Sequence, residues 1–191
     1  MLHVVRHGRT EANAAGLLLG RLDPDLDALG IRQATAVAAA IGPVDRVVSS
    51  PLLRAVRTAK AFGLDVETDD RWLELDYGDL DGTSVFDVPS STWVQWRADL
   101  DWAPPGGESH AALGERVRSA CEDLLAEAAG SEVVVVSHVS PIKAALAWAL
   151  GVGDEIAWRC FVAPASVLRI AVGPGGPTVR SFNDVAHLGA L

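Results

Sequence analysis

The chain has 191 residues, which is enough for one well-buried domain and fewer than two full domains usually need. Its 49% hydrophobic and 21% charged residues are typical of a folded globular protein and exclude a disordered or fibrous chain. The formal net charge of −9 excludes a general positive field that would attract nucleic acid or acidic lipid, so neither is an expected partner.

The segment at residues 1–10 has a short apolar run followed by polar residues. It lacks the long apolar stretch and the cleavage site of a signal peptide. The longest apolar run elsewhere, residues 144–150, is too short to span a bilayer. These features predict a cytoplasmic protein without membrane contact.

Short runs rich in valine and isoleucine predict buried strands at residues 2–5, 44–48 and 133–136. Residues 167–172 and 178–182 flank a Gly/Pro turn and predict a hairpin at the edge of the sheet.

Four helices are expected, each after a residue that can cap a helix, and two of these caps are followed by proline. The first follows Asp27 and runs to about residue 41, and the second opens at Ser50-Pro51 and runs to about residue 62. The third follows Ser109 and ends at Gly130, and the fourth covers residues 142–150 after Ser140-Pro141.

Strands that alternate with helices predict an α/β protein with a three-layer α/β/α fold and a mostly parallel central sheet. Residues 1–191 are expected to form a single domain. Within it, residues 78–107 are rich in tryptophan and proline and show no clear strand. We expect them to form an irregular lid segment inserted over the edge of the sheet.

Two arginines and two histidines follow predicted strands. Arg6 and His7 come directly after the first strand, Arg54 lies in the first turn of the helix after the second, and His138 follows the strand at residues 133–136. Ligands of open α/β sheets bind outside the carboxyl ends of the strands. Arginine binds phosphate oxygens in pairs and a neutral imidazole can attack phosphorus, so this cluster predicts a site for phosphoryl transfer.

A series of segments in the right order resembles the signature of the histidine phosphatase superfamily, in its phosphoglycerate mutase-like branch. An Arg-His-Gly triplet alone would be weak support, but the ordered series covers nearly the whole chain and is specific. The matching segments are residues 6–13, 20–23, 26–30 with 33–34, 50–55 with 58–59, 73–78, 105–109 and 136–138.

The resemblance implies a phosphoglycerate mutase-like fold and a role for each matching residue. His7 would be the phosphorylated nucleophile, and Arg6, Arg54 and His138 would complete the phosphate pocket. Glu74 would be the general acid, because an alkoxide leaves poorly unless it receives a proton. The scheme requires no metal and no cofactor. The expected substrate-binding residues are Thr10, Asn13, Gly20, Arg21, Tyr77, Glu108 and Ser109.

Some positions depart from the family pattern, although none removes a catalytic group. Arg9 replaces the usual acidic or amide residue and is expected to add positive charge near the mouth of the site. Val139 replaces a common glycine after the second histidine, and Asp27 replaces a common threonine that would cap the same helix. Residues 78–82 lack a common tryptophan.

Structural roles compete with functional ones at several positions. Ser109 would serve equally well as a helix cap, and His138 could be an ordinary core histidine. Glu74 lies among other acidic residues, any of which could simply be solvated. His3, His110 and His187 are expected to be structural or surface residues.

The inserted segment favours hydrolysis over transfer. A mutase must rebind an intermediate with two phosphate-bearing ends, but between Leu75 and His110 the only basic residue is Arg97, among several aspartates. We therefore expect a phosphomonoesterase of the histidine acid phosphatase type that acts on small-molecule phosphate esters whose organic part is not strongly anionic. The alternatives are a cofactor-dependent phosphoglycerate mutase and a non-catalytic module that binds phosphate esters. A homodimer is compatible with the sequence, which does not determine the oligomeric state.

Overall fold

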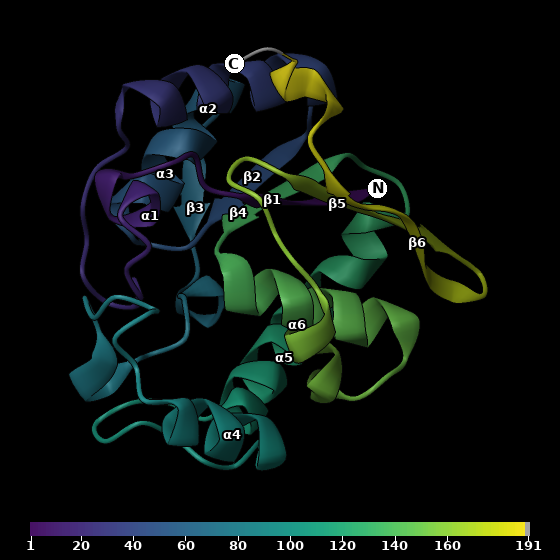
Figure 1. Cartoon of the computed structure of the whole chain (residues 1–191). Coiled ribbons are helices and arrows are strands. Elements are labelled where there is room, and N and C mark those ends of the chain that lie inside the picture. The colour runs from purple at the N-terminus through teal and green to yellow at the C-terminus, as the bar shows by residue number, and fades with distance from the viewer. Residues whose placement is uncertain (190–191) are drawn as a thin grey trace.

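The central sheet of the computed structural model, which describes residues 1–189, has six strands in the order β3-β2-β4-β1-β5-β6 (Figure 1). The first four strands of this order run parallel, and β5 and β6 form an antiparallel hairpin at one edge. The mostly parallel sheet and its edge hairpin are therefore confirmed. The strands are β1 (Leu2–Arg6), β2 (Arg46–Ser49), β3 (Val66–Thr68), β4 (Val133–Ser137), β5 (Val167–Gly173) and β6 (Gly176–Asp184).

Helices cover both faces of the sheet, and the valines of β4 show why. Val133 and Val135 pack in one buried cluster with α5 and α6, whereas Val134 and Val136 pack in a second cluster with α2 and α3. Full burial of each valine contributes about 1.5–3 kcal/mol, so both faces of this strand require a covering layer (Figure 1). The covering helices are α2 (Ala28–Ile41), α3 (Leu53–Ala59), α5 (His110–Ala128) and α6 (Val139–Leu150).

Two of the four predicted helix caps are confirmed. The carboxylate of Asp27 accepts a hydrogen bond of 2.7 Å from the N–H of Gly30 at the start of α2. The hydroxyl of Ser109 accepts one of 3.2 Å from the N–H of Ala112 at the start of α5. Both satisfy a backbone donor that the first turn of a helix leaves unpaired.

The two caps followed by proline were predicted wrongly. Helix α3 starts at Leu53, whose N–H donates to the carboxylate of Asp23 at 2.7 Å, and the hydroxyl of Ser50 instead lies 2.7 Å from an imidazole nitrogen of His138. Helix α6 starts at Val139 rather than after Ser140, because the distant carboxylate of Glu74 accepts the first two N–H groups of the helix. A contact across the fold replaces the local cap in both cases.

The segment at residues 78–107 differs from the expected irregular lid. It contains a helix, α4 (Ser90–Ala98), whose start has no side-chain cap and therefore no local sequence signal. Trp96 is almost fully buried, stacks on Trp93 with ring centroids 5.6 Å apart, and contacts His110 of α5. The part of the segment that contains α4 packs against the start of α5 and the turn that carries Trp158, whereas residues 82–85 bond to residues 16–18 of the loop after β1.

The remaining elements are short. The edge strand β3 was not predicted, because three partly exposed residues carry too little periodicity. No helix in the part of the chain that the structure describes is long and apolar enough to cross a membrane. The other turns are α1 (Glu11–Ala14) and the 3₁₀ turns Lys60–Phe62, Asp70–Trp72, Gly78–Leu80, Asp154–Arg159 and Ala186–Leu188.

Candidate active site

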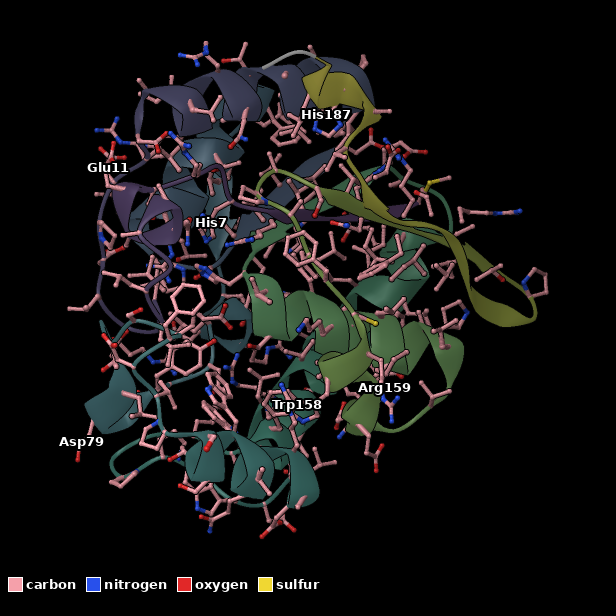
Figure 2. All side chains as sticks on the ribbon, in the orientation of Figure 1. His7, Glu11, Asp79, Trp158, Arg159 and His187 are labelled. Carbon is pink, nitrogen blue, oxygen red and sulfur yellow. The ribbon has the colours of Figure 1, made fainter. Side chains whose placement is uncertain are left out.

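The carboxyl ends of three parallel strands bring the predicted residues to one edge of the sheet. His7 follows β1, and the pairing of β1 with β4 places Arg6 beside Ser137, the residue before His138. The ring centroids of His7 and His138 are 5.0 Å apart. Arg54 reaches His138 from the first turn of α3, after β2. Figure 2 shows His7 at this edge of the sheet.

His7 is buried, and its hydrogen bonds fix its tautomer. Nδ1 lies 2.7 Å from the carbonyl oxygen of Gly8, which can only accept, so Nδ1 carries the proton and Nε2 keeps its lone pair. Burial lowers the pKa of His7 well below its ordinary value, and the charges of Arg6 and Arg54 lower it further. His7 is therefore a neutral imidazole with a nucleophilic nitrogen.

His138 has the opposite tautomer. The guanidinium Nε of Arg54 donates to Nδ1 at 3.3 Å, which leaves the proton on Nε2, 2.7 Å from the hydroxyl of Ser50. Burial, followed by the charge of Arg54, lowers the pKa of His138 well below its ordinary value. Ser50 thus belongs to the site, although its sequence context, a serine before proline, indicated only a helix cap.

No carboxylate of residues 1–189 forms an ion pair with the guanidinium of Arg6. Nη1 donates to the carbonyl of Val162 at 2.7 Å, while the buried Nε finds no acceptor within residues 1–189. Burial lowers its pKa to about 10, so the group stays charged at neutral pH. An unpaired buried donor on a cation is costly unless a ligand satisfies it, and an anion fits this position.

Arg54 is fully buried and tied to the loop that precedes α2. Nη1 donates to the carbonyl of Leu22 at 2.7 Å, and Nη2 donates to those of Leu19 and Gly20 at 3.2 and 3.0 Å. Its Nε holds His138, so four of its five N–H donors have protein acceptors. Arg54 consequently supplies positive charge and holds His138 in place. One N–H donor remains, which is too few for a bidentate contact with phosphate.

Glu74 is held at the N-terminus of α6. Oε1 accepts hydrogen bonds from the N–H groups of Leu75 and Ser140 at 2.8 and 3.1 Å, and Oε2 accepts one from Val139 at 3.0 Å. A carboxylate offers four acceptor positions, so one remains, on Oε2. The Glu74 charge raises the pKa of the Arg6 guanidinium, which places the carboxylate at the same site.

Of the expected substrate-binding residues, Gly20 contacts the site directly, because its carbonyl accepts a hydrogen bond from Arg54. Arg21 instead donates to the carboxylate of Asp76 at 3.2 Å. Tyr77 packs edge-on against Trp96, and burial raises the pKa of its phenol above the ordinary range.

The other four expected substrate-binding residues make structural contacts. Thr10 and Asn13 cap each other at the start of α1, with reciprocal bonds of 3.1 Å. Glu108 is held by both ends of the Arg116 guanidinium at 2.7 and 2.8 Å. The hydroxyl of Ser109 caps α5.

The positive charge of Arg9, which was expected near the mouth of the site, is neutralised by Asp27, because Nε of Arg9 donates to the Asp27 carboxylate at 2.7 Å. These two departures from the family pattern therefore form one ion pair that also caps α2. Val139 lies in α6, where a glycine is not required, and its N–H binds Glu74. Within residues 1–189 there is no group of three or more His, Cys, Asp or Glu side chains that could hold a metal ion.

All five histidines have a pKa below the ordinary value, and burial is the largest cause for each. Below about pH 6.5 the unfolded chain binds protons that the folded chain does not, so the free energy of unfolding should fall as the pH falls. For His110, whose pKa burial lowers to about 4, we expect a loss of about 2 kcal/mol between about pH 7.5 and pH 5, and the lowered pKa values of His7 and His138 add to this loss. Urea unfolding at several pH values across this range measures the free energy of unfolding and so checks this prediction.

The control for this prediction is His110→Gln, because burial lowers the pKa of His110 to about 4. This variant should flatten the pH dependence by up to about 1.4 kcal/mol per pH unit below pH 6. Stability that stays constant from about pH 7.5 to pH 5 would contradict the neutral, buried state of these histidines.

Comparison with known proteins decides the family. The model of the histidine phosphatase superfamily (branch 1) matches residues 2–185, which include the whole site. The chain belongs to the histidine phosphatase superfamily. The resemblance seen in the sequence and the phosphoglycerate mutase-like fold are both confirmed.

Relatives within the histidine phosphatase superfamily carry different activities. Phosphoserine phosphatase 1 of Hydrogenobacter thermophilus is 32% identical over 200 residues, which cover 98% of this chain and 94% of that protein. The probable phosphoglycerate mutase GpmB of Yersinia enterocolitica is 33% identical over 201 residues, covering 97% and 93%. A crystal structure of the Entamoeba histolytica phosphoserine phosphatase with 3-phosphoglyceric acid has a TM-score of 0.89, 27% identity and 98% coverage of both chains.

A relative from Mycobacterium tuberculosis is 36% identical over 199 residues. The chain spans about half of the length of that relative, 54%. Proteins named as phosphatases and one named as a probable phosphoglycerate mutase are therefore among the relatives of this chain.

Proposed function

We propose that the protein hydrolyses small-molecule phosphate monoesters through a phosphohistidine on His7, as a phosphomonoesterase of the histidine acid phosphatase type. The observation that carries the proposal is the tautomer of His7. Its proton is held on Nδ1 by the carbonyl of Gly8, which leaves the lone pair on Nε2, and the charge of the Arg6 guanidinium, whose Nε has no acceptor within residues 1–189, acts on this ring. A neutral imidazole next to fixed positive charge suits attack on a phosphoryl group.

Two balanced steps complete the reaction. The Nε2 lone pair of His7 attacks phosphorus, the bond to the alcohol oxygen breaks, and protonated Glu74 gives its proton, carried on Oε2, to that oxygen. Water then attacks the phosphohistidine, its proton passes to the Glu74 carboxylate, and the P–N bond breaks to restore the lone pair of His7. Arg6, Arg54 and the hydrogen-bonded His138 compensate charge on the transferring group.

Charge in the inserted segment favours water as the acceptor. Arg97, the basic residue of residues 78–107, is exposed, and its guanidinium lies 5.5 Å over the ring of Trp158. Asp81, whose charge acts on Arg54 of the site, would repel a second phosphate. Mutase activity is the second candidate, supported by the relative named as a phosphoglycerate mutase.

The test of this proposal compares hydrolysis with transfer. The purified protein, in buffer with a chelator, should release inorganic phosphate from p-nitrophenyl phosphate. Given 3-phosphoglycerate, it should release phosphate faster than it forms 2-phosphoglycerate. Formation of 2-phosphoglycerate that is faster than phosphate release would show that the protein is a mutase rather than a phosphatase. Tight binding of phosphate esters without any turnover would leave a non-catalytic binding module.

A further inference from the structure

The carbonyl that fixes the tautomer of His7 belongs to the peptide group between Gly8 and Arg9. Nδ1 of His7 lies 2.7 Å from this carbonyl oxygen. The N–H at the other end of the same peptide group, that of Arg9, donates to Oε1 of Gln33 at 2.9 Å. Gln33 is a buried residue of α2. One chain of hydrogen bonds therefore runs from the His7 ring through a peptide group to the side chain of Gln33.

Close packing requires a glycine at position 8. A Cβ atom on Gly8 would lie 2.4 Å from the carbonyl oxygen of Gly30 in α2, so a larger residue does not fit there. Glycine leaves the backbone dihedrals freer than any other residue does. The Gly8 carbonyl is therefore free to turn away from His7 unless hydrogen bonds hold the peptide groups on its two sides.

Two buried side chains hold these peptide groups. The hydroxyl of Thr58 in α3 accepts the N–H of Gly8 at 3.0 Å, and Gln33 accepts that of Arg9. Both helices lie on the same face of the sheet (Figure 1). Of the two side chains, Gln33 is the one that binds the peptide group whose carbonyl faces His7. Because a peptide group is planar, a rotation that breaks the bond to Gln33 also turns the carbonyl away from His7.

Gln33 also acts on the His7 ring by polarising this peptide group. An amide that donates a hydrogen bond becomes a better acceptor at its oxygen, and the strengthening is about 10–30% per bond in a chain. Burial lowers the pKa of His7, whereas the hydrogen bond to Gly8 raises it. A stronger bond at Nδ1 therefore makes the lone pair on Nε2 more basic.

We propose that Gln33 is a positioning residue for the nucleophile. It holds the plane of the peptide group between Gly8 and Arg9, and thereby keeps the proton of His7 on Nδ1 and the lone pair on Nε2. The inference rests on the proposed function, which assigns the attack on phosphorus to His7. In this role Gln33 acts through the peptide group and not on the substrate. Its loss should therefore slow the attack and leave the binding of the ester nearly unchanged.

The first test measures the attack alone. Gln33→Met keeps the length of the side chain and removes its oxygen. In stopped-flow measurements with p-nitrophenyl phosphate, the rate constant of the first step at saturating ester should fall about 10- to 100-fold, the effect of a small misplacement of a reacting group. The ester concentration at half-saturation should change by about twofold or less. Gln33→Glu, whose carboxyl group still offers an oxygen to the Arg9 N–H, should restore the rate to within about threefold of the wild type.

The control for this test is Ala34→Gly. Ala34 is the next residue of α2 and is also buried, and glycine weakens the interior of a helix without removing the oxygen that binds the Arg9 N–H. This variant should be less stable than the wild type and should keep its first-step rate constant.

The second test needs no turnover. The ¹⁵N resonances of the two ring nitrogens of His7, assigned by their absence in His7→Asn, report which nitrogen carries the proton. The wild type should show a proton on Nδ1. In Gln33→Met the two resonances should move toward each other as the ratio of the two tautomers falls about two- to tenfold, and in Ala34→Gly they should not move. Gln33→Asn, whose oxygen is withdrawn by one methylene, should give the same shift and replaces Gln33→Met if that variant does not fold.

The two measurements separate this inference from the proposed function. If His7→Asn still hydrolyses esters but the His7 resonances respond to Gln33, the proposed function falls and the hold of Gln33 on the ring stands. Resonances that stay unchanged in both Gln33→Met and Gln33→Asn would overturn the positioning role and leave the phosphatase intact. Resonances that move without any change in the first step would also overturn it, because the tautomer would then not control the attack.

Discussion

Replacing His7 with asparagine should lower kcat by at least about 10⁴-fold for every phosphate monoester that the wild type hydrolyses. The amide nitrogen of asparagine takes the place of Nδ1 and keeps the donor to the Gly8 carbonyl, which is 2.7 Å away in the wild type. The variant lacks Nε2, whose lone pair attacks phosphorus. Turnover of p-nitrophenyl phosphate measures the loss. The intact mass of protein quenched at alkaline pH should show a phosphoryl group on the wild type only.

The matched control for this substitution is His3→Gln. His3 is a buried histidine of the same strand whose Nε2 contacts Glu132 at 2.7 Å, far from the strand's carboxyl end, and glutamine keeps a donor at that position. This variant should keep the wild-type kcat. Turnover and phosphoenzyme that persist in His7→Asn would exclude His7 as the nucleophile and transfer the role to another residue of the site.

The place of the site at one edge of the sheet could be predicted from the sequence, because the carboxyl ends of parallel strands lie at the same edge. Polar residues that directly follow buried valine runs, such as His7 and His138, must meet at that edge. The helical spacing of apolar residues predicted both layers of helices, and nearby side-chain oxygens that can accept a backbone N–H predicted the caps of α2 and α5. These features depend on the chain's local pattern, which a single sequence contains.

Contacts between distant segments could not be predicted in this way. The tautomer of His138 depends on Arg54 and Ser50, which come from a different loop, and α6 begins where Glu74 meets it, 65 residues away in the chain. Arg9 and Asp27 appeared as separate departures although they form one pair. The family resemblance indicated that these residues lie near the site. Which side chain each of them contacts depends on packing across the whole fold.

The charge around the inserted segment shows the same limit. Counting basic residues in the segment at 78–107 found only Arg97, whereas Lys143 of α6 lines the pocket beside Trp93 and Trp96 of that segment. Helix α4 lacks a side-chain cap, so its tryptophans could not be assigned to a wall of the site from the sequence. The segment that forms one wall of a pocket does not by itself determine the charge within the pocket.

Replacing Glu74 with glutamine should lower kcat by about 10²- to 10⁴-fold for alkyl phosphates, because their alkoxides need the proton that Glu74 gives. For p-nitrophenyl phosphate the first step should be nearly unaffected, since nitrophenolate leaves without a proton. The second step still needs Glu74 as the base that accepts a proton from water. Stopped-flow measurement should therefore show a burst of nitrophenolate equal to the enzyme concentration, followed by slow turnover.

A purely structural role for Glu74 would give a different pattern. The carboxylate accepts three backbone N–H groups, so glutamine places an NH₂ group against one of them and should lower the free energy of unfolding by about 1–3 kcal/mol. A variant that is only destabilised would lose activity equally on alkyl and nitrophenyl esters and would show no burst. Glu108→Gln, which removes the neighbouring carboxylate paired with Arg116, should reproduce the destabilisation without separating the two esters. The dependence on the leaving group is what distinguishes a proton donor from a helix cap.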